Sequence, residues 1–281
     1  MFSLKLNQFF RLVLVVFLIL VSAGASLGAT MYVGELYSGN LYTVDTGTLT
    51  SSLIGPAGIG LGFGGLGFAN DGTLYGWTTS TDSLYTVNTG TGAWSLVGGG
   101  TPSAGDTFDI NPVSNVGYVT DIINDKLYSV NLGTGVTTLS TGLSGFVYAG
   151  GSAFDPTGTL FYIDLVYSGS GSIRSADIST GIVSLVGVTG ISGIFPNLGY
   201  NPSDKMLYSI EVSSAHLFMF NPTTGAGTDL GLVSGLPVGS VNDVQFTMST
   251  FQVESVPEPC TLFLLGFGLA GVGLFRRRFK N

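Results

Sequence analysis

Charged residues are scarce in this chain of 281 residues: 9% are Asp, Glu, Lys or Arg, whereas roughly a quarter is usual for a globular protein. Basic residues are rarest in the central part. Between Thr30 and Val256 there are only three, Lys126, Arg174 and Lys205, against 16 acidic residues. Because a nucleic-acid-binding surface needs clustered positive charge to neutralise phosphates, this imbalance argues against nucleic acid as a partner.

Cysteine and histidine are nearly absent, with one of each. A single cysteine, Cys260, provides neither an internal disulfide framework nor a cysteine-based metal site. A single histidine, His216, excludes three-histidine metal sites, and no serine–histidine–aspartate triad can be assembled around it from the sequence. We therefore expect His216 to occupy a surface or turn position, and we assign no catalytic residue.

Two glycine patterns, at 62–67 and 266–271, match the dinucleotide-binding fingerprint G-x-G-x-x-G. That fingerprint requires a strand before it, a helix after it and an acidic residue about twenty positions further on. The second match has ten residues after it, none of them acidic. The first lies in a glycine-rich stretch that we expect to be a loop, and no helical pattern follows it. We therefore expect no nucleotide cofactor.

Residues 1–29 have the layout of a secretory signal peptide. Lys5 and Arg11 precede ten apolar residues, Leu12 to Val21, and the small-residue sequence Ala23-Gly24-Ala25 follows. A basic region, an apolar region and an A-x-A cleavage site are the three parts of such a signal. We expect the Sec translocon to export the chain and signal peptidase to process it. An uncleaved N-terminal anchor is the alternative.

The C-terminal segment, residues 257–281, combines three elements in order. The motif Pro257-Glu258-Pro259 precedes an apolar stretch at 261–275, which we expect to form a short transmembrane helix, and a basic stop at 276–280 follows. This apolar stretch is shorter than the about twenty residues typical of a stable span. The basic stop contains three consecutive arginines, Arg276, Arg277 and Arg278. By the positive-inside rule they remain cytoplasmic, which leaves the preceding body outside.

This arrangement resembles the PEP-CTERM sorting signal, with residues 251–256 as a linker to the body. The resemblance implies export in a Gram-negative bacterium that makes exopolysaccharide. It also implies recognition by exosortase, a membrane-embedded cysteine protease that removes the tail. The expected path is an inner-membrane-tethered precursor followed by a final location at the cell surface or in the extracellular matrix.

The body, residues 30–250, is a tandem repeat. Five similar segments begin at Leu41, Leu84, Leu127, Ile173 and Leu217, at intervals of 43, 43, 46 and 44 residues. The second unit predicts four short strands, near 65–69, 73–78, 83–88 and 93–97, with Asn70-Asp71-Gly72 as a hairpin turn. Four antiparallel strands at a period near 44 residues are typical of a β-propeller blade.

The two ends of the array are incomplete in complementary ways. The first unit predicts three strands, near 30–35, 40–44 and 49–54, without a leading strand, and the end of the array supplies one near 241–249. Pairing these ends completes a blade and removes exposed strand edges. We predict an all-β, five-bladed propeller of four-stranded antiparallel blades, closed by its N- and C-terminal strands and flanked by the signal helix and the short transmembrane helix.

Propellers usually bind ligands at the mouth of the central channel. Candidate polar residues near it are Asp106 and Asp109 in one blade and Asn242 and Asp243 in the closing blade. Their oxygens suit calcium, which would then be the only cofactor. Solvated loop carboxylates or turn caps are the alternative interpretation.

Two tryptophans, Trp77 and Trp94, have no counterpart in the other repeats. An unrepeated tryptophan on a propeller is a candidate for stacking on a sugar ring. Packing in the core is the alternative, and it is the interpretation that we favour.

The sequence as a whole favours a non-catalytic, structural or adhesive propeller that contacts exopolysaccharide, a ligand that only the resemblance of the tail implies. The alternative is a secreted propeller hydrolase or lactonase with calcium at the channel mouth. Clustered acids around the channel would indicate the enzyme, whereas glycine, alanine and threonine there would indicate the scaffold. An exposed apolar patch on one face would instead indicate a protein-binding propeller.

Overall fold

The computed structural model describes residues 29–35, 39–59, 62–100, 105–164, 169–237 and 244–247, with only the backbone described at 63, 105–106 and 244–247. The predicted signal helix, linker, sorting motif and transmembrane helix lie outside these ranges, as do Asn242 and Asp243. Within the ranges, no helix has the length and apolar character needed to cross a membrane.

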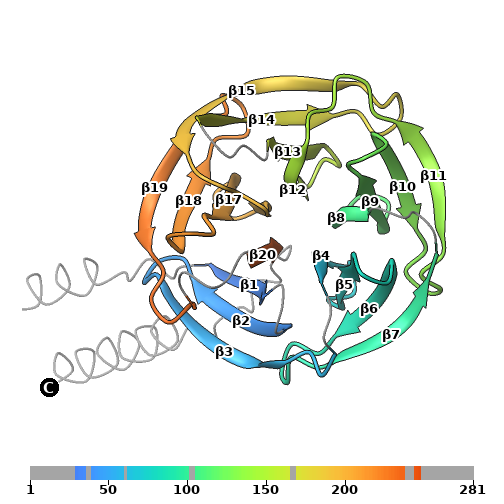
Figure 1. Ribbon diagram of the computed structural model, residues 1–281, viewed down its shortest axis with the longest axis horizontal. Helices are drawn as coiled ribbons and strands as arrows, with labels where there is room; N and C mark the ends of the chain where they lie inside the picture. Colours follow the sequence, from blue (N-terminus) through green and yellow to red (C-terminus); the bar gives the residue numbers. More distant parts are fainter. Residues whose placement is uncertain are drawn as a thin grey trace, which may run out of the picture. The chain divides into compact units, whose positions relative to one another are not determined.

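The described chain forms five antiparallel sheets of four strands each, placed one after another around a central axis (Figure 1). We number these sheets as blades 1 to 5 and name the strands of each blade from the innermost to the outermost. Blade 1 contains β20 (Val244–Thr247), β1 (Thr30–Glu35), β2 (Asn40–Asp45) and β3 (Thr50–Pro56). Blade 2 contains β4 (Phe63–Phe68), β5 (Leu74–Thr78), β6 (Ser83–Val87) and β7 (Trp94–Gly99).

The remaining three blades have the same order. Blade 3 contains β8 (Gly105–Asn111), β9 (Val116–Asp121), β10 (Lys126–Val130) and β11 (Thr137–Gly142). Blade 4 contains β12 (Ala149–Phe154), β13 (Leu160–Asp164), β14 (Ser170–Ala176) and β15 (Val183–Ser192). Blade 5 contains β16 (Gly199–Asn201), β17 (Met206–Ile210), β18 (His216–Phe220) and β19 (Gly227–Leu232). The predicted five-bladed propeller is confirmed.

Blade 1 is built from both ends of the body. Its inner strand β20 pairs antiparallel with β1 in a register that places Tyr32 opposite Thr247 and Glu35 opposite Val244. The predicted closure of the ring is therefore confirmed. β20 therefore covers the edge of β1, which would otherwise be open for pairing with another chain.

The turn between the third and fourth strands has the same hydrogen bonds in every blade. It begins with Asp or Asn, whose Oδ1 accepts the backbone N–H groups two and three residues further on. In blade 2, for example, Asn88 Oδ1 accepts bonds from Gly90 N at 2.9 Å and Thr91 N at 3.0 Å. The other four turns begin with Asp45, Asn131, Asp177 and Asn221. Because this turn favours Asp or Asn at its first position, the same residue types recur in every unit and indicate the repeat in the sequence.

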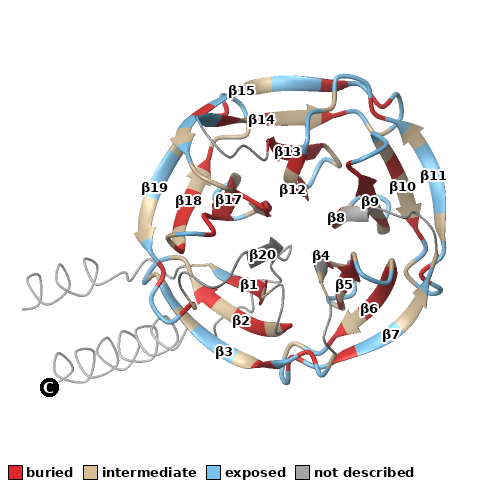
Figure 2. Ribbon diagram, viewed as in Figure 1, coloured by how far each residue is buried: buried red, intermediate tan, exposed pale blue. Residues whose placement is uncertain are grey.

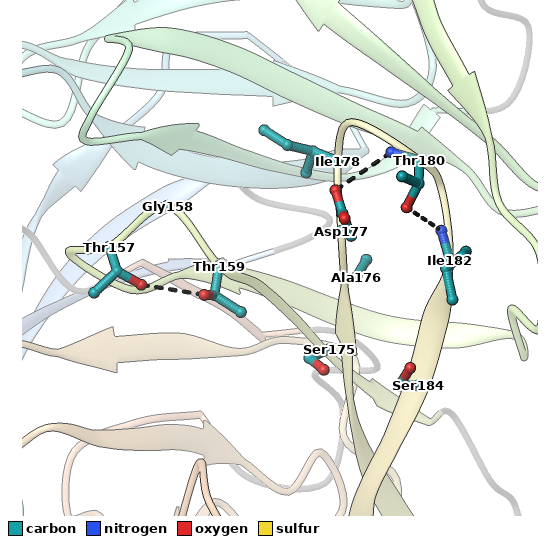
Figure 3. A pocket seen from close by; sticks show the side chains of 10 residues that line it. All are labelled: Thr157, Gly158, Thr159, Ser175, Ala176, Asp177, Ile178, Thr180, Ile182 and Ser184. Atoms are coloured by element: carbon teal, nitrogen blue, oxygen red, sulfur yellow. Dashed lines mark hydrogen bonds between the residues drawn. The ribbon is translucent and has the colours of Figure 1, made fainter.

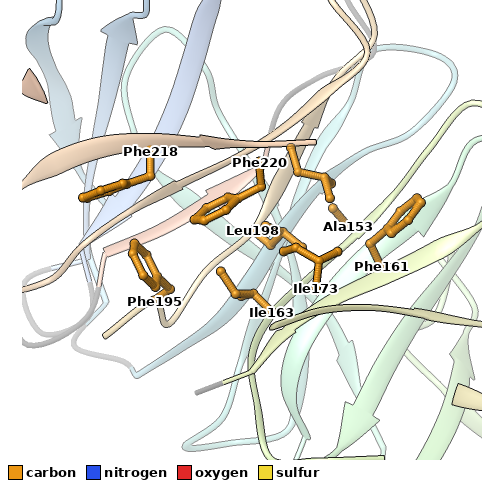
Figure 4. Close-up of a cluster of buried hydrophobic side chains, with 9 residues drawn as sticks. Ala153, Phe161, Ile163, Ile173, Phe195, Leu198, Phe218 and Phe220 are labelled. Atoms are coloured by element: carbon orange, nitrogen blue, oxygen red, sulfur yellow. The ribbon is translucent and has the colours of Figure 1, made fainter. Parts of the chain in front are cut away.

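The hydrophobic core lies between neighbouring blades. Between blades 4 and 5, Ile163 and Ile173 of one sheet face Phe218 and Phe220 of the next, with Phe195 packed edge-on against both phenylalanines (Figure 4). Equivalent clusters fill the spaces between blades 1 and 2, 2 and 3, and 3 and 4. Burial accordingly concentrates in the inner strands, while the outer strands alternate intermediate and exposed residues (Figure 2).

Neighbouring blades also meet through backbone at the outer edge. The glycine that ends the turn of blade 2, Gly92, has a φ of +77°, and a Cβ there would overlap the carbonyl of Gly55 in blade 1. Gly135, Gly181 and Gly225 make the same contact in blades 3, 4 and 5. In blade 1 the position is Leu49, which adopts a φ of 54° without being glycine.

The glycine-rich stretch 62–67 is not the loop that the sequence predicted. Residues 63–68 form β4, the inner strand of blade 2. A Cβ at Gly65 would overlap the backbone of Phe108 in blade 3, so glycine is required where two inner strands approach each other. The pattern thus reflects close packing near the axis and has neither the loop nor the helix of a dinucleotide site.

Replacing Gly92 by alanine tests the contact at the outer edge. We expect Gly92→Ala to lower the free energy of unfolding by about 3 kcal/mol, because positive φ and steric overlap both oppose a Cβ. Gly72→Ala is the matched control in the same blade, since its φ is +84° but nothing lies within 4 Å of the added atom. It should cost about 1 kcal/mol. Equal losses in thermal unfolding would contradict the proposed overlap.

Truncation tests the closure of the ring. A chain that ends at residue 243 lacks β20, so β1 keeps an open edge, and we expect a large loss of cooperative thermal unfolding together with aggregation. A chain that ends at residue 250 keeps β20 and should unfold cooperatively. Size-exclusion chromatography and circular dichroism distinguish the two, and similar behaviour of both chains would show that the pairing is dispensable.

Candidate functional site

A small cavity lies among the inner strands of blades 2, 3 and 4. Its volume is about 10 Å³, and the residues that line it include Gly65, Gly151, Thr107 and Ser152. The hydroxyls of Thr107 and Ser152 bond to each other at 2.9 Å. A cavity of this size holds about one water molecule. This cavity therefore has no room for a substrate.

Asp109 connects two blades. It lies in β8, and its Oδ2 accepts a hydrogen bond of 2.7 Å from the backbone N–H of Phe154 in β12 of the next blade. Its Oδ1 accepts a bond of 2.7 Å from Ile110 N. Burial raises the pKa of the Asp109 carboxyl to about 7, although the two backbone hydrogen bonds act in the opposite direction. The geometry gives this residue a role in holding blades 3 and 4 together.

The other proposed calcium ligands are not placed. Asp106 lies in β8, but its side chain is not among those described, and Asn242 and Asp243 fall outside the described ranges. Among the residues that the structure does describe, no three His, Cys, Asp or Glu side chains are close enough together to hold a metal ion. A calcium site at the channel mouth stays a prediction.

Both tryptophans are buried between blades. Trp77 is 0% exposed and stacks on Phe108 at a centroid distance of 6.3 Å, and Trp94 is 8% exposed and lies 5.7 Å from Tyr85. The Trp94 ring also occupies the space above Gly76, where any Cβ would overlap it. With neither ring face open to solvent, both residues pack in the core instead of offering a platform for a sugar.

His216, the first residue of β18, lies at the surface. Its Nδ1 is 3.0 Å from Oδ2 of Asp229 on the neighbouring strand β19. The nearby Ser214 hydroxyl donates to Glu211 Oε2 at 2.7 Å and also accepts a bond from His216 N. The serine therefore bonds to a carboxylate and to the backbone, and the group is not a serine–histidine–aspartate triad.

Two of the described concave sites are grooves on blades 3 and 4. Each has a volume of about 520 Å³. Each lies between the turn that joins the first two strands of its blade and the turn that joins the last two, as Figure 3 shows for blade 4. The grooves occupy equivalent positions in neighbouring repeats. We call them groove 3 and groove 4 after their blades.

Pairs of hydroxyl groups on the outer two strands line both grooves. In groove 4, Ser175 of β14 is paired with Ser184 of β15. In groove 3, Ser129 of β10 is paired with Thr138 of β11. Aliphatic side chains lie beside each pair. In groove 4 these include Ile182, which is exposed. Each groove therefore offers hydrogen-bonding groups next to an apolar surface.

The grooves were not predicted from the sequence, because no single residue that lines them indicates a binding site. The signal lies in the aligned repeats, where the position after the LY pair carries a hydroxyl in Thr43, Thr86 and Ser129 and the aligned position in blade 4 is Ser175. Blade 5 departs from this pattern with Met219. A hydroxyl that recurs on an exposed strand face is not needed for packing. Its recurrence could therefore have identified this face as a binding surface.

Residues 255–278 match the PEP-CTERM protein-sorting motif. This chain carries a PEP-CTERM sorting motif. The motif marks an exported protein that exosortase processes, and it confirms the interpretation of Pro257-Glu258-Pro259 and the arginine cluster that follows. It covers the tail alone and bears on no residue of the propeller.

Comparisons of the whole chain support the fold. Among curated proteins no sequence matches it. A chain in the crystal structure of a nidogen/laminin complex is similar in structure, with a TM-score of 0.54, 13% identity and coverage of 79% of this chain and 82% of that one.

Two enzymes are more weakly similar. Hydrazine synthase of Kuenenia stuttgartiensis has a TM-score of 0.46 at 13% identity, covering 78% of this chain and 86% of the other. Virginiamycin B lyase of Staphylococcus aureus has a TM-score of 0.45 at 12% identity, with 78% of each chain covered. Neither likeness is close enough to bear on function.

The raised pKa of Asp109 predicts a pH dependence of stability. The folded-state pKa, about 7, lies above the usual aspartate value of 3.8, so the folded protein binds this proton more tightly than the unfolded chain. The contribution of the protonated Asp109 carboxyl to the free energy of unfolding is complete below pH 4 and is lost as the pH rises through 7. We expect thermal stability to fall by an amount worth a few kcal/mol between these limits.

The variant Asp109→Asn should lack this component, so the difference between wild type and variant should grow as the solution is acidified from pH 8 to pH 5. Calorimetry across this range measures it. A constant difference would show that Asp109 titrates in the folded state as it does in the unfolded chain.

Proposed function

We propose that the propeller of this exported, exosortase-sorted protein binds extracellular polysaccharide and does not transform it. The observation that carries the proposal is the presence of equivalent hydroxyl-lined grooves on two neighbouring blades. A polysaccharide is itself a repeat of hydroxyl-bearing units with apolar ring faces. Repeated grooves of matching chemistry suit such a ligand.

The form of the channel supports the absence of catalysis. Glycine, threonine and serine residues are among those that line its described cavity, whose volume is about 10 Å³. The one carboxylate that the sequence placed near the channel and whose contacts are described, Asp109, accepts two backbone hydrogen bonds. A hydrolase needs a pair of carboxylates that both reach the substrate, and Asp109 is committed to holding two blades together.

The sorting motif supports the place where this function operates. A protein that exosortase releases from its membrane-inserted tail arrives at the cell surface or in the matrix of the Gram-negative bacterium that produces it, where exopolysaccharide is abundant. The excess of acidic over basic residues between Thr30 and Val256, 16 against three, favours solubility in that environment. The proposed role is structural or adhesive.

A binding titration tests the proposal. The purified full chain, in detergent, is titrated with the exopolysaccharide of the producing bacterium, and reducing ends are assayed in parallel. We expect saturable binding without release of new reducing ends, unchanged by a calcium chelator. Release of reducing ends would instead support the hydrolase, and loss of binding in chelator would point to the acids around Asp106. Absence of binding to any polysaccharide would refute the proposed function.

A further inference from the structure

We infer that grooves 3 and 4 bind separate segments of one uncharged polysaccharide chain. This inference rests on the proposed function and adds to it the site, the charge class of the ligand and the number of contacts. It comes from three properties of the grooves: their exposed hydroxyls, the sign of the charges around them and their repetition.

The hydroxyls that line the grooves are available to a ligand. The side-chain hydroxyls of Ser175 and Ser184 in groove 4 make no hydrogen bond to any other residue within the described ranges. In groove 3, the Ser129 hydroxyl donates to the carbonyl of Thr138 at 3.3 Å, which leaves its lone pairs free to accept. Such groups exchange bonds with water for bonds with sugar hydroxyls at little cost, while the aliphatic neighbours remove apolar ring faces from water.

The charges around groove 4 exclude an acidic polysaccharide. Asp177 lines the groove, and Asp155 lies beside it, where it accepts a hydrogen bond of 2.7 Å from the groove residue Thr157. The nearest base in sequence, Arg174, precedes Ser175 on the same strand and therefore points to the opposite face. Its Nε bonds to Asp164 at 2.8 Å. No lysine or arginine is among the residues that line groove 4, so a uronate or sulfate group there would meet the negative charge of Asp177 without a lining cation to balance it.

Groove 3 also favours an uncharged polysaccharide, because its lining contains no positive charge. No lysine or arginine is among the residues that line it, and its polar groups are Asn, Ser and Thr. Neutral hydroxyl and amide groups bind neutral sugars through directional hydrogen bonds, but they supply no charge to offset the desolvation of a carboxylate. Both grooves thus select for the same class of ligand.

The repetition of the grooves gives a long chain an advantage over a short one. When one segment occupies a groove, the next segment is held close to the equivalent groove of the adjacent blade, so its binding becomes intramolecular. The resulting gain in overall affinity is typically about 10² to 10⁴. Blade 5 differs at this register, since Met219 takes the place of the hydroxyl opposite Thr228.

Tryptophan substitutions at exposed groove positions test the inference. Thr138→Trp fills groove 3 and Ser184→Trp fills groove 4. Thr228→Trp is the control, because this exposed residue lies at the same register of blade 5. The full chain in detergent is titrated with the producer's exopolysaccharide, separated by anion exchange into uncharged and acidic fractions. A short oligosaccharide prepared from the uncharged fraction is the third probe. Thermal unfolding confirms that each variant is folded, and Ser129→Ala and Ser175→Ala replace any that is not.

We expect the uncharged fraction to bind and the acidic fraction to bind at least about tenfold more weakly. Each groove variant should weaken binding of the long chain at least about tenfold and lower the number of short oligosaccharides bound by one. The control should leave both unchanged. Equal binding of the acidic fraction would overturn the charge selection. A double variant carries both Thr138→Trp and Ser184→Trp, so both grooves are filled. If it binds the uncharged fraction as tightly as the wild type does, the site is overturned while the proposed function stays intact. No binding of either fraction to the wild type would overturn both.

Discussion

The pairing of β1 with β20 is the interaction on which the rest of the structure depends. It joins residues more than two hundred positions apart, such as Tyr32 and Thr247, and the entropy of closing so long a loop opposes it. Every other blade is local in sequence and packs only against its neighbours. A second long-range contact, the bridge between Thr50 and Ser234, also joins blades 1 and 5. Without these non-local pairings the array would end in two open faces, each exposing part of a hydrophobic core.

A second constraint follows from closing a ring with few blades. Inner strands must approach one another so closely that backbone meets backbone, as Gly65 meets Phe108. Glycine makes this contact possible, and 44 glycines in the chain reflect the demand. The same crowding leaves a cavity of about 10 Å³ at the axis. The described grooves lie instead between the turns, where polar side chains of the outer strands are exposed.

The fold could be predicted closely because its signals are local. The turn that begins at Asn88 carries its own caps, and β6 and β7 begin within one residue of the expected positions. The candidate site could be predicted less well, because the burial of its residues and their hydrogen-bond partners depend on contacts between blades. Trp94 is buried by packing over Gly76. Asp109 owes its raised pKa to a place between blades and its partner Phe154 lies 45 residues away. No pattern within a single repeat reports such neighbours.

The composite construction of blade 1 also sets an order of events during export. A chain that crosses the membrane from its N-terminus delivers β1 first and β20 last, so blade 1 stays incomplete until residues 244–247 have emerged. The sorting motif begins only eight residues after β20, at 255. Completion of the ring and arrival of the sorting motif at the membrane therefore coincide, and the protein reaches its protease at about the moment it first becomes able to fold.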